Sequence, residues 1–193
     1  MNSELVLDLE TKKSFQEVGG KYNMHLLGVS VVGVYAYKTD EFYAFEESEF
    51  ARLEELLQSA SRVIGFNSKH FDFPVLQPHV RLDLKGVAHL DLMEDVEHGA
   101  GFRISLDNLA QASLGVGKSS HGLQAITWWK EGNVEAIKKY CLDDVRITRD
   151  LYEYGKKNGF VAFDSRDART KLTIPVTWDK AYEPTRNTQA SLF

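Results

Sequence analysis

Three strand-like segments follow one another at the start of the chain with no long helical segment between them. They are residues 4–10 (ELVLDLE), 26–37 (LLGVSVVGVYAY) and 41–46 (EFYAFE), all rich in aliphatic or aromatic side chains. Parallel neighbours need a long crossover that is usually a helix, whereas antiparallel neighbours do not. We therefore expect these three segments to form an antiparallel meander.

The later strands are reached through helices. A helical pattern over 48–60 precedes a short apolar segment at 62–66, and a fifth strand is expected at 86–91. Beyond it the chain is mostly helical, with one helix from Ser105 to Gly115 and a longer one from Asn133 to Gly155. The pattern predicts an α/β fold, in which a mixed five-stranded sheet is flanked by helices.

Composition bounds the class of protein. The chain has 193 residues, a formal net charge of −5 and one cysteine, Cys141. The net charge argues against coating of nucleic acid by bulk electrostatics, but it leaves metal-mediated phosphate contacts open. A single cysteine cannot form an internal disulfide, and the N-terminal residues lack the pattern of a secretory signal. We expect a soluble, cytoplasmic protein.

Two acidic residues share one face of the first strand. Side chains two apart on a strand point the same way, so Asp8 and Glu10 lie together while Leu7 and Leu9 point into the core. Two carboxylates on one face repel each other unless a cation lies between them. An Asp-x-Glu pair also occurs at solvated strand ends, so this pair alone does not identify a metal site.

Two further polar groups follow at longer range. Asn67 and Asp72 come after a buried strand, at the start of an expected helix, and Asp72 stands between two phenylalanines. Tyr140 and Asp144 are four residues apart, so they occupy one face of the last long helix, while the neighbouring Asp143 points elsewhere. Each feature is also compatible with a purely structural role.

The three features in this order resemble the motifs of the DEDD superfamily of 3′–5′ exonucleases. The match is Asp-x-Glu-Thr on the first strand, Asn-x-x-x-Phe-Asp after a later strand and Tyr-x-x-x-Asp on a late helix, over residues 4–155. The last motif resembles the tyrosine subgroup, because Lys139 stands where the histidine subgroup has its histidine. The resemblance implies a ribonuclease-H-like fold.

Four carboxylates form an oxygen-only ligand set suited to Mg²⁺ or Mn²⁺. By resemblance, two such ions are bound by Asp8, Glu10, Asp72 and Asp144, and Tyr140 orients the attacking water. The first, second and fourth of these acids are expected at the ion that activates water. The candidates for contacts with the terminal nucleotide are Thr11, Asn67, Phe71 and Met24.

The chain is expected to divide into a catalytic domain, residues 1–163, and a partly ordered tail, residues 164–193. The tail ends in QASLF, which resembles the Gln-Leu-(Ser/Asp)-Leu-Phe peptide that binds the bacterial sliding clamp, with Ala190 in place of leucine. The resemblance implies clamp contacts through Gln189, Ser191, Leu192 and Phe193. Within the tail, residues 171–178 (KLTIPVTW) look strand-like and are candidates for packing on the domain.

Three functions remain open at this point. One is a 3′–5′ exonuclease on DNA 3′ ends, recruited in replication or repair through the tail, and another is an exoribonuclease of the same fold that trims RNA ends. The third is a non-catalytic domain that binds nucleic acid or a partner. The complete set of four acids and Tyr140 disfavours the third function, because repelling carboxylates have no physical reason to gather without a cation.

Overall fold

The N-terminal strands form the antiparallel half of a sheet in the computed structural model, which describes residues 3–117, 123–165 and 170–178. Strand β1 (Leu5–Thr11) pairs with β2 (Val29–Ala36), which in turn pairs with β3 (Glu41–Phe45). Both pairings are antiparallel, as expected from the lack of a helical crossover.

The parallel half of the sheet lies on the other side of β1. Strand β4 (Val63–Gly65) pairs with β1, and β5 (His89–Asp91) pairs with β4, which gives the order β3-β2-β1-β4-β5. Helix α1 (Phe50–Ser59) leads into β4, and α2 (Asp72–Leu76) follows it. The expected mixed five-stranded sheet flanked by helices is confirmed.

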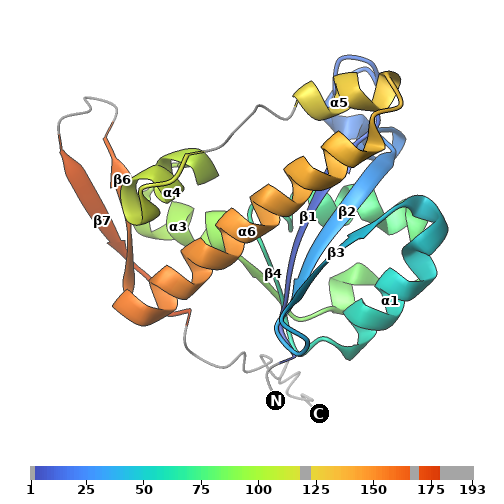
Figure 1. The fold of residues 1–193 in the computed structure, drawn as a ribbon. Coiled ribbons are helices and arrows are strands. Elements are labelled where there is room, and N and C mark those ends of the chain that lie inside the picture. The colour runs from blue at the N-terminus through green and yellow to red at the C-terminus, as the bar shows by residue number, and fades with distance from the viewer. Residues whose placement is uncertain (1–2, 118–122, 166–169, 179–193) are drawn as a thin grey trace, which may run out of the picture.

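The remaining helices come after β5 or connect the other elements. The longer ones are α3 (Leu92–Ala100), α4 (Leu106–Leu114), α5 (Leu123–Lys130) and α6 (Val134–Asn158). Short 3-10 helices occur at Lys21–Leu26, Glu47–Glu49, Gln77–His79 and Leu84–Gly86. Figure 1 shows α6 lying across β1 and β2, with α5 at its N-terminal end. Among the described residues, no helix is both long enough and apolar enough to span a bilayer.

Alternation along β1 divides the core into two layers. Leu5, Leu7 and Leu9 belong to the apolar cluster that includes residues of α1 and α2. Val6 belongs instead to the cluster that contains Tyr152 of α6 and residues of α3 and α4. Side chains two apart on a strand lie on the same face, so Asp8 and Glu10 lie with Val6 on the α6 side of the sheet.

Two expected strands are shorter than the sequence suggested. The segment expected from residue 26 becomes a strand only at Val29, because Leu26 closes a 3-10 helix and Gly28 has a positive φ of 65°. The strand expected over 86–91 begins at His89, since Gly86 ends another 3-10 helix. Both corrections move a strand start and leave the order of the sheet unchanged.

Helix α6 continues past Gly155, which was expected to end it. Its C-cap is Gly159, at φ 73°, and the Gly159 N–H donates to the carbonyl of Gly155. The ring of Trp178 lies against Gly155, where an added Cβ would be 2.3 Å from Trp178 Cε3. The missing side chain therefore serves close packing rather than termination.

The segment after α6 adds a second, two-stranded sheet. Strand β6 (Phe160–Asp164) pairs antiparallel with β7 (Lys171–Pro175), so the strand-like reading of 171–178 is confirmed over 171–175. Trp178 is buried, and its Nε1–H donates to Asp95 Oδ2 of α3 at 2.6 Å. Residues 170–178 are thus part of the folded body, while residues 179–193 lie outside the described ranges.

A buried polar network closes the sheet at the start of β1. Arg62 forms an ion pair with Glu4 and donates to the hydroxyl of Tyr152 at 2.6 Å. The Tyr152 hydroxyl also donates to Glu4, at 3.0 Å from Oε1, and Arg62 reaches the carbonyl of Trp178 at 3.4 Å. The network lies at the N-terminal end of β1. It joins the residues just before β1 and β4 to α6 and to the segment after β7.

Candidate active site

Three carboxylates meet at the opposite end of β1. Asp8 and Glu10 of β1 and Asp144 of α6 each offer an oxygen, and these atoms all lie within 4.8 Å of one another. Glu10 and Asp144 are buried, and Asp8 is half-buried. The structure thus brings together two residues of the first motif and one of the third.

Close contact between α6 and the sheet makes this convergence possible. Gly33 of β2 pairs with Asp8 across the ladder. A Cβ on Gly33 would be 2.8 Å from Cys141 Sγ and 2.9 Å from Val145 Cγ2. Because Gly33 has no side chain, the α6 residues next to Asp144 lie directly on the β2 backbone.

Tyr140 lies one turn before Asp144 on α6 and is buried. Burial, then the negative charges of Asp144, Glu10 and Asp8, and a hydrogen bond to Asp144 raise the pKa of the phenol. The hydroxyl therefore stays protonated at neutral pH and can donate a hydrogen bond. The ring of Trp128 in α5 packs edge-on against it, with 6.1 Å between the centroids.

Asp72 is not among the three carboxylates whose oxygens all lie within 4.8 Å of one another. It is buried at the start of α2, and its Oδ1 accepts the N–H of Leu9 at 3.0 Å. Strand β4 ends at Gly65, so Asp72 bonds β1 beyond the end of the parallel ladder. The fourth acid of the expected set is thereby joined to the residue between Asp8 and Glu10.

A cavity of about 350 Å³ adjoins Glu10. Thr11 and Phe71, two of the expected substrate contacts, line it, as do Phe15 and residues of α5. Phe71 meets Phe15 edge-on at 5.8 Å between centroids. The Thr11 hydroxyl donates to the carbonyl of Lys13 at 2.9 Å, which fixes its orientation at the rim.

The other expected contacts lie elsewhere. Within the described ranges, neither Met24 nor Asn67 lines this cavity; Met24 packs against the core cluster of α1 and α2. Asn67 has a positive φ of 62° in the loop after β4. The clamp-like residues Gln189, Ser191, Leu192 and Phe193 fall outside the described residues.

A larger cavity, of about 510 Å³, lies beside α2 and β5. The described residues that line it are mainly apolar and include no carboxylate; they are Lys69, Phe73, Pro74, Gln77, Pro78, Leu84, Lys85, Val87 and His89. Without an acidic oxygen it lacks the groups that bind a divalent cation. The cavity beside Glu10 is therefore the better candidate for the reacting end of a substrate.

Sequence reasoning missed several residues of the site. Gly33 stands within a β-branched segment, and a glycine there can signal close backbone approach. Trp128, Phe15, Leu123 and Ile126 reach the site only through tertiary packing, which no local pattern reveals. Asp91 is the N-cap of α3, and it also accepts a hydrogen bond from the loop after β4, a contact that no local pattern reveals.

The donor set fits a hard divalent cation. Asp8, Glu10 and Asp144 provide only carboxylate oxygens, which Mg²⁺ and Mn²⁺ prefer over nitrogen or sulfur sites. Cys141 lies nearby with its Sγ 3.8 Å from Asp8 Oδ2, but burial and then the charges of Asp8 and Glu10 raise the pKa of its thiol. The neutral thiol is not competent as a soft anionic ligand.

Comparison with known proteins supports the fold. The family B DNA polymerase from the hyperthermophilic archaeon Pyrobaculum calidifontis is similar in structure, with a TM-score of 0.61 and 20% sequence identity. The match covers 80% of this chain and 24% of the polymerase chain, so this protein spans about a quarter of that length. No curated protein matches the chain in sequence.

The family model is more direct. Residues 5–155, from the start of β1 to Gly155 in α6, match the model of the RNase H superfamily. The matched range contains the whole five-stranded sheet and all three converging carboxylates. The fold, the acidic cluster on β1 and α6, and this match together show that the chain belongs to the RNase H superfamily.

Proposed function

We propose that the protein is a divalent-metal-dependent 3′–5′ exonuclease that hydrolyses phosphodiester bonds of DNA. The observation that carries the proposal is the approach of Asp8, Glu10 and Asp144 to within 4.8 Å beside the buried Tyr140. Membership of the RNase H superfamily supports nuclease chemistry in general. The tyrosine motif on α6 supports the exonuclease assignment by its resemblance to the DEDD tyrosine subgroup.

The carboxylates are the groups that would hold the metal. Asp8, Glu10 and Asp144 would bind Mg²⁺ or Mn²⁺, with Asp72 at the edge of a two-ion site. Bound there, the ions supply activation of water and neutralisation of the phosphate charge. Asp72 itself keeps β1 in place through the Leu9 N–H, and so sets the spacing of Asp8 and Glu10.

Tyr140 acts in this proposal as a hydrogen-bond donor and not as a base. Its raised pKa keeps the proton on the hydroxyl, and the bond with Asp144 orients that group. A neutral donor at this position can hold the attacking water or a phosphate oxygen in line for reaction. We assign to it the positioning of the water.

The cavity beside Glu10 would receive the terminal nucleotide. Its volume of about 350 Å³ lies at the small end of the range of ligand pockets, which suits one nucleotide better than a duplex. Phe71 and Phe15 offer aromatic surface to a base, and Thr11 offers a polar group at the rim. Asn67 and Met24 would contact the substrate only if it extends beyond the cavity.

The preference for DNA depends on the tail. Gln189, Ser191, Leu192 and Phe193 resemble the clamp-binding peptide, and we propose that they recruit the enzyme to a bacterial sliding clamp during replication or repair. A short peptide with two apolar anchors binds modestly because ordering it costs entropy. Tethering would still raise the local concentration of nuclease at DNA. Trimming of RNA 3′ ends is the alternative activity.

The test uses single strands of DNA and RNA, each labelled at the 5′ or the 3′ end, with Mn²⁺, Mg²⁺ or EDTA. We expect stepwise shortening of DNA from the 3′ end that requires the metal. Asp144→Asn should abolish it, whereas Asp143→Asn is the matched control, because Asp143 forms a surface ion pair with Arg146. Degradation of RNA alone selects the exoribonuclease, and internal cuts or inactivity on both polymers reject the proposal.

A further inference from the structure

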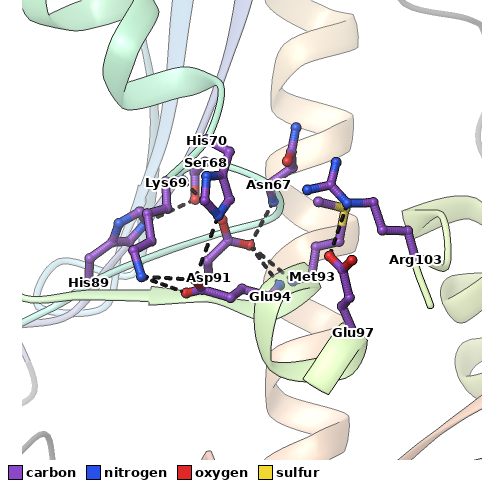
Figure 2. A network of polar contacts seen from close by, with 10 residues as sticks. All are labelled: Asn67, Ser68, Lys69, His70, His89, Asp91, Met93, Glu94, Glu97 and Arg103. Atoms are coloured by element: carbon purple, nitrogen blue, oxygen red, sulfur yellow. Dashed lines mark hydrogen bonds and ion pairs between the residues drawn. The ribbon is translucent and has the colours of Figure 1, made fainter. Parts of the chain in front are cut away.

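The carboxylate of Asp91 connects two elements that are far apart in sequence. Asp91 ends β5, is buried, and accepts the N–H groups of Met93 at 3.0 Å and Glu94 at 3.3 Å as the N-cap of α3. The same side chain also accepts the N–H of Asn67 at 2.8 Å and the N–H of Lys69 at 2.9 Å. Figure 2 shows the carboxylate between the loop and the helix start.

The loop after β4 depends on these bonds for its shape. Asn67 is left-handed, with φ 62°, and a Cβ on Gly65 would be 2.0 Å from Ser68 Oγ, so the turn is tight. Asparagine tolerates left-handed backbone better than most residues other than glycine, but a tight turn of this kind still needs support from its surroundings. Asp91 gives that support, because it accepts from the amides on either side of Ser68.

Backbone hydrogen bonds from this loop position the residues next to Asp72. The Asn67 carbonyl accepts the N–H of Phe71 at 2.9 Å, and the Ser68 carbonyl accepts the N–H of Phe73 at 2.8 Å. These two bonds fix the residues on either side of Asp72. Phe71 lines the cavity beside Glu10, and Asp72 holds the N–H of Leu9.

We propose that Asp91 is a positioning residue of the exonuclease, which sets Phe71 and Asp72 through the loop Asn67–Phe71. The inference rests on the proposed function and adds a group outside the acidic motifs. Among the described residues, Asp91 belongs neither to the cavity lining nor to the three converging carboxylates, and its carboxylate accepts from four backbone amides. Removing a supporting hydrogen bond of this kind costs roughly 10- to 100-fold in activity.

The ion pairs between the same elements contribute much less. Lys69 Nζ lies 2.8 Å from Glu94 Oε2, and His70 Nε2 lies 3.6 Å from Glu94 Oε1. The Lys69 side chain is 55% exposed, and exposed ion pairs add little to stability. Glu94→Gln removes these ion pairs and keeps the bonds of Asp91, so it tests whether loss of any contact between the loop and α3 lowers activity.

The decisive variant is Asp91→Ser. Serine is a good N-cap, so it keeps a bond to the start of α3, but it is too short to reach both loop amides. We expect kcat/KM on 3′-labelled DNA to fall at least about tenfold with a severalfold rise in KM. A loss of folded protein lowers kcat alone, so the rise in KM separates positioning from instability.

Three further variants complete the design. Asp91→Asn keeps an acceptor for the Asn67 N–H and loses the one for the Lys69 N–H. Its KM should therefore lie between those of wild type and Asp91→Ser. If Asp91→Ser does not fold, Asp91→Asn replaces it as the test variant. Ser105→Ala removes the N-cap of α4, where Ser105 Oγ accepts the Asn108 N–H at 3.2 Å, without touching the loop. Ser105→Ala and Glu94→Gln should stay within about twofold of wild type, in contrast to the roughly 10- to 100-fold loss of a supporting bond.

Amide hydrogen exchange gives a readout that does not need activity. In Asp91→Ser the amides of Asn67 and Lys69 should exchange at least about tenfold faster, while that of Met93 stays protected. Wild-type kcat and KM in Asp91→Ser, or equal losses in Ser105→Ala, would overturn the inference and leave the nuclease assignment standing. Wild-type protein that degrades neither DNA nor RNA would instead reject the proposed function itself.

Discussion

Gly33 lies directly opposite Asp8 in the β1–β2 ladder, and α6 fills the space that a Gly33 side chain would need. The first acid of the site and the contact that admits the helix are therefore on paired residues. Because Gly33 has no side chain, α6 lies close to the sheet, and Asp144 can approach Asp8. This relationship leads to the first prediction.

Gly33→Ala should separate α6 from the sheet. The added Cβ would be 2.8 Å from Cys141 Sγ. Overpacking of this kind lowers the free energy of unfolding by about 1–3 kcal/mol. The affinity for Mn²⁺, measured by titration calorimetry, should fall as Asp144 retreats. Gly86→Ala is the control, because its Cβ would meet no atom within 4 Å among the described residues; equal losses in both variants would contradict the prediction.

Asp144→Asn should have opposite effects with and without metal. In EDTA it removes one of three mutually repelling carboxylates, and a gain on the order of 1 kcal/mol would raise Tm by about 2–4 °C. Mn²⁺ at a hundred times its Kd should stabilise the wild type by about 2.7 kcal/mol and the variant far less. Thermal melts in both buffers measure the crossover, and a variant less stable than wild type in EDTA speaks against a repulsive cluster.

Tyr140→Phe should lower kcat by about 10- to 100-fold while metal affinity stays near the wild-type value. The ring still packs against Trp128, and only the hydroxyl that bonds Asp144 is lost. Because the pKa of Tyr140 is raised, both proteins should show pH–rate profiles of the same shape between pH 6 and about 9, below the ordinary tyrosine pKa. An alkaline limb present only in the wild type would indicate that Tyr140 acts as a base.

His89 should make the fold sensitive to acid. Burial lowers its pKa to about 4 from an ordinary 6.5, although the charge of Asp91 acts in the opposite direction. The unfolded chain takes up the proton first, so stability is lost as the pH falls from 6.5 to 4. The wild type should lose roughly 3 kcal/mol more than His89→Gln across this range, as measured by urea unfolding. Parallel pH curves would show that another group controls the loss.

Deletion of residues 189–193 should abolish binding to a purified bacterial sliding clamp and leave the nuclease rate on free oligonucleotides unchanged. Substitution of Leu192 and Phe193 by alanine tests the two apolar anchors separately from chain length. Surface plasmon resonance with immobilised clamp gives the affinity. Clamp binding that survives the deletion excludes the peptide as the contact.

Local sequence patterns predicted correctly which of the candidate residues share a face of their strand or helix. The period of two put Asp8 and Glu10 on one face of β1, and the period of four put Tyr140 and Asp144 on one face of α6. Both periods are backbone geometry, which the sequence expresses directly. The mixed sheet followed from where helices were missing or present between strands.

Nonlocal contacts decided what the sequence left open. Gly155 looks like a helix end, but α6 continues to Asn158, and the glycine instead makes room for the ring of Trp178. Asp91 caps the helix that follows it, but its partners Asn67 and Lys69 lie 24 and 22 residues away. Pairing of this kind depends on sheet order and register, which local patterns do not determine.

Trp178 and the three carboxylates lie at opposite ends of β1. The Trp178 carbonyl accepts a hydrogen bond from Arg62 beside Glu4, and Glu10 lies six positions further along the extended chain, on the order of 20 Å away. The end of the molecule where Trp178 lies is therefore remote from the acidic cluster of Asp8, Glu10 and Asp144. A partner or a solid support bound at that end of the molecule would leave the acidic cluster uncovered.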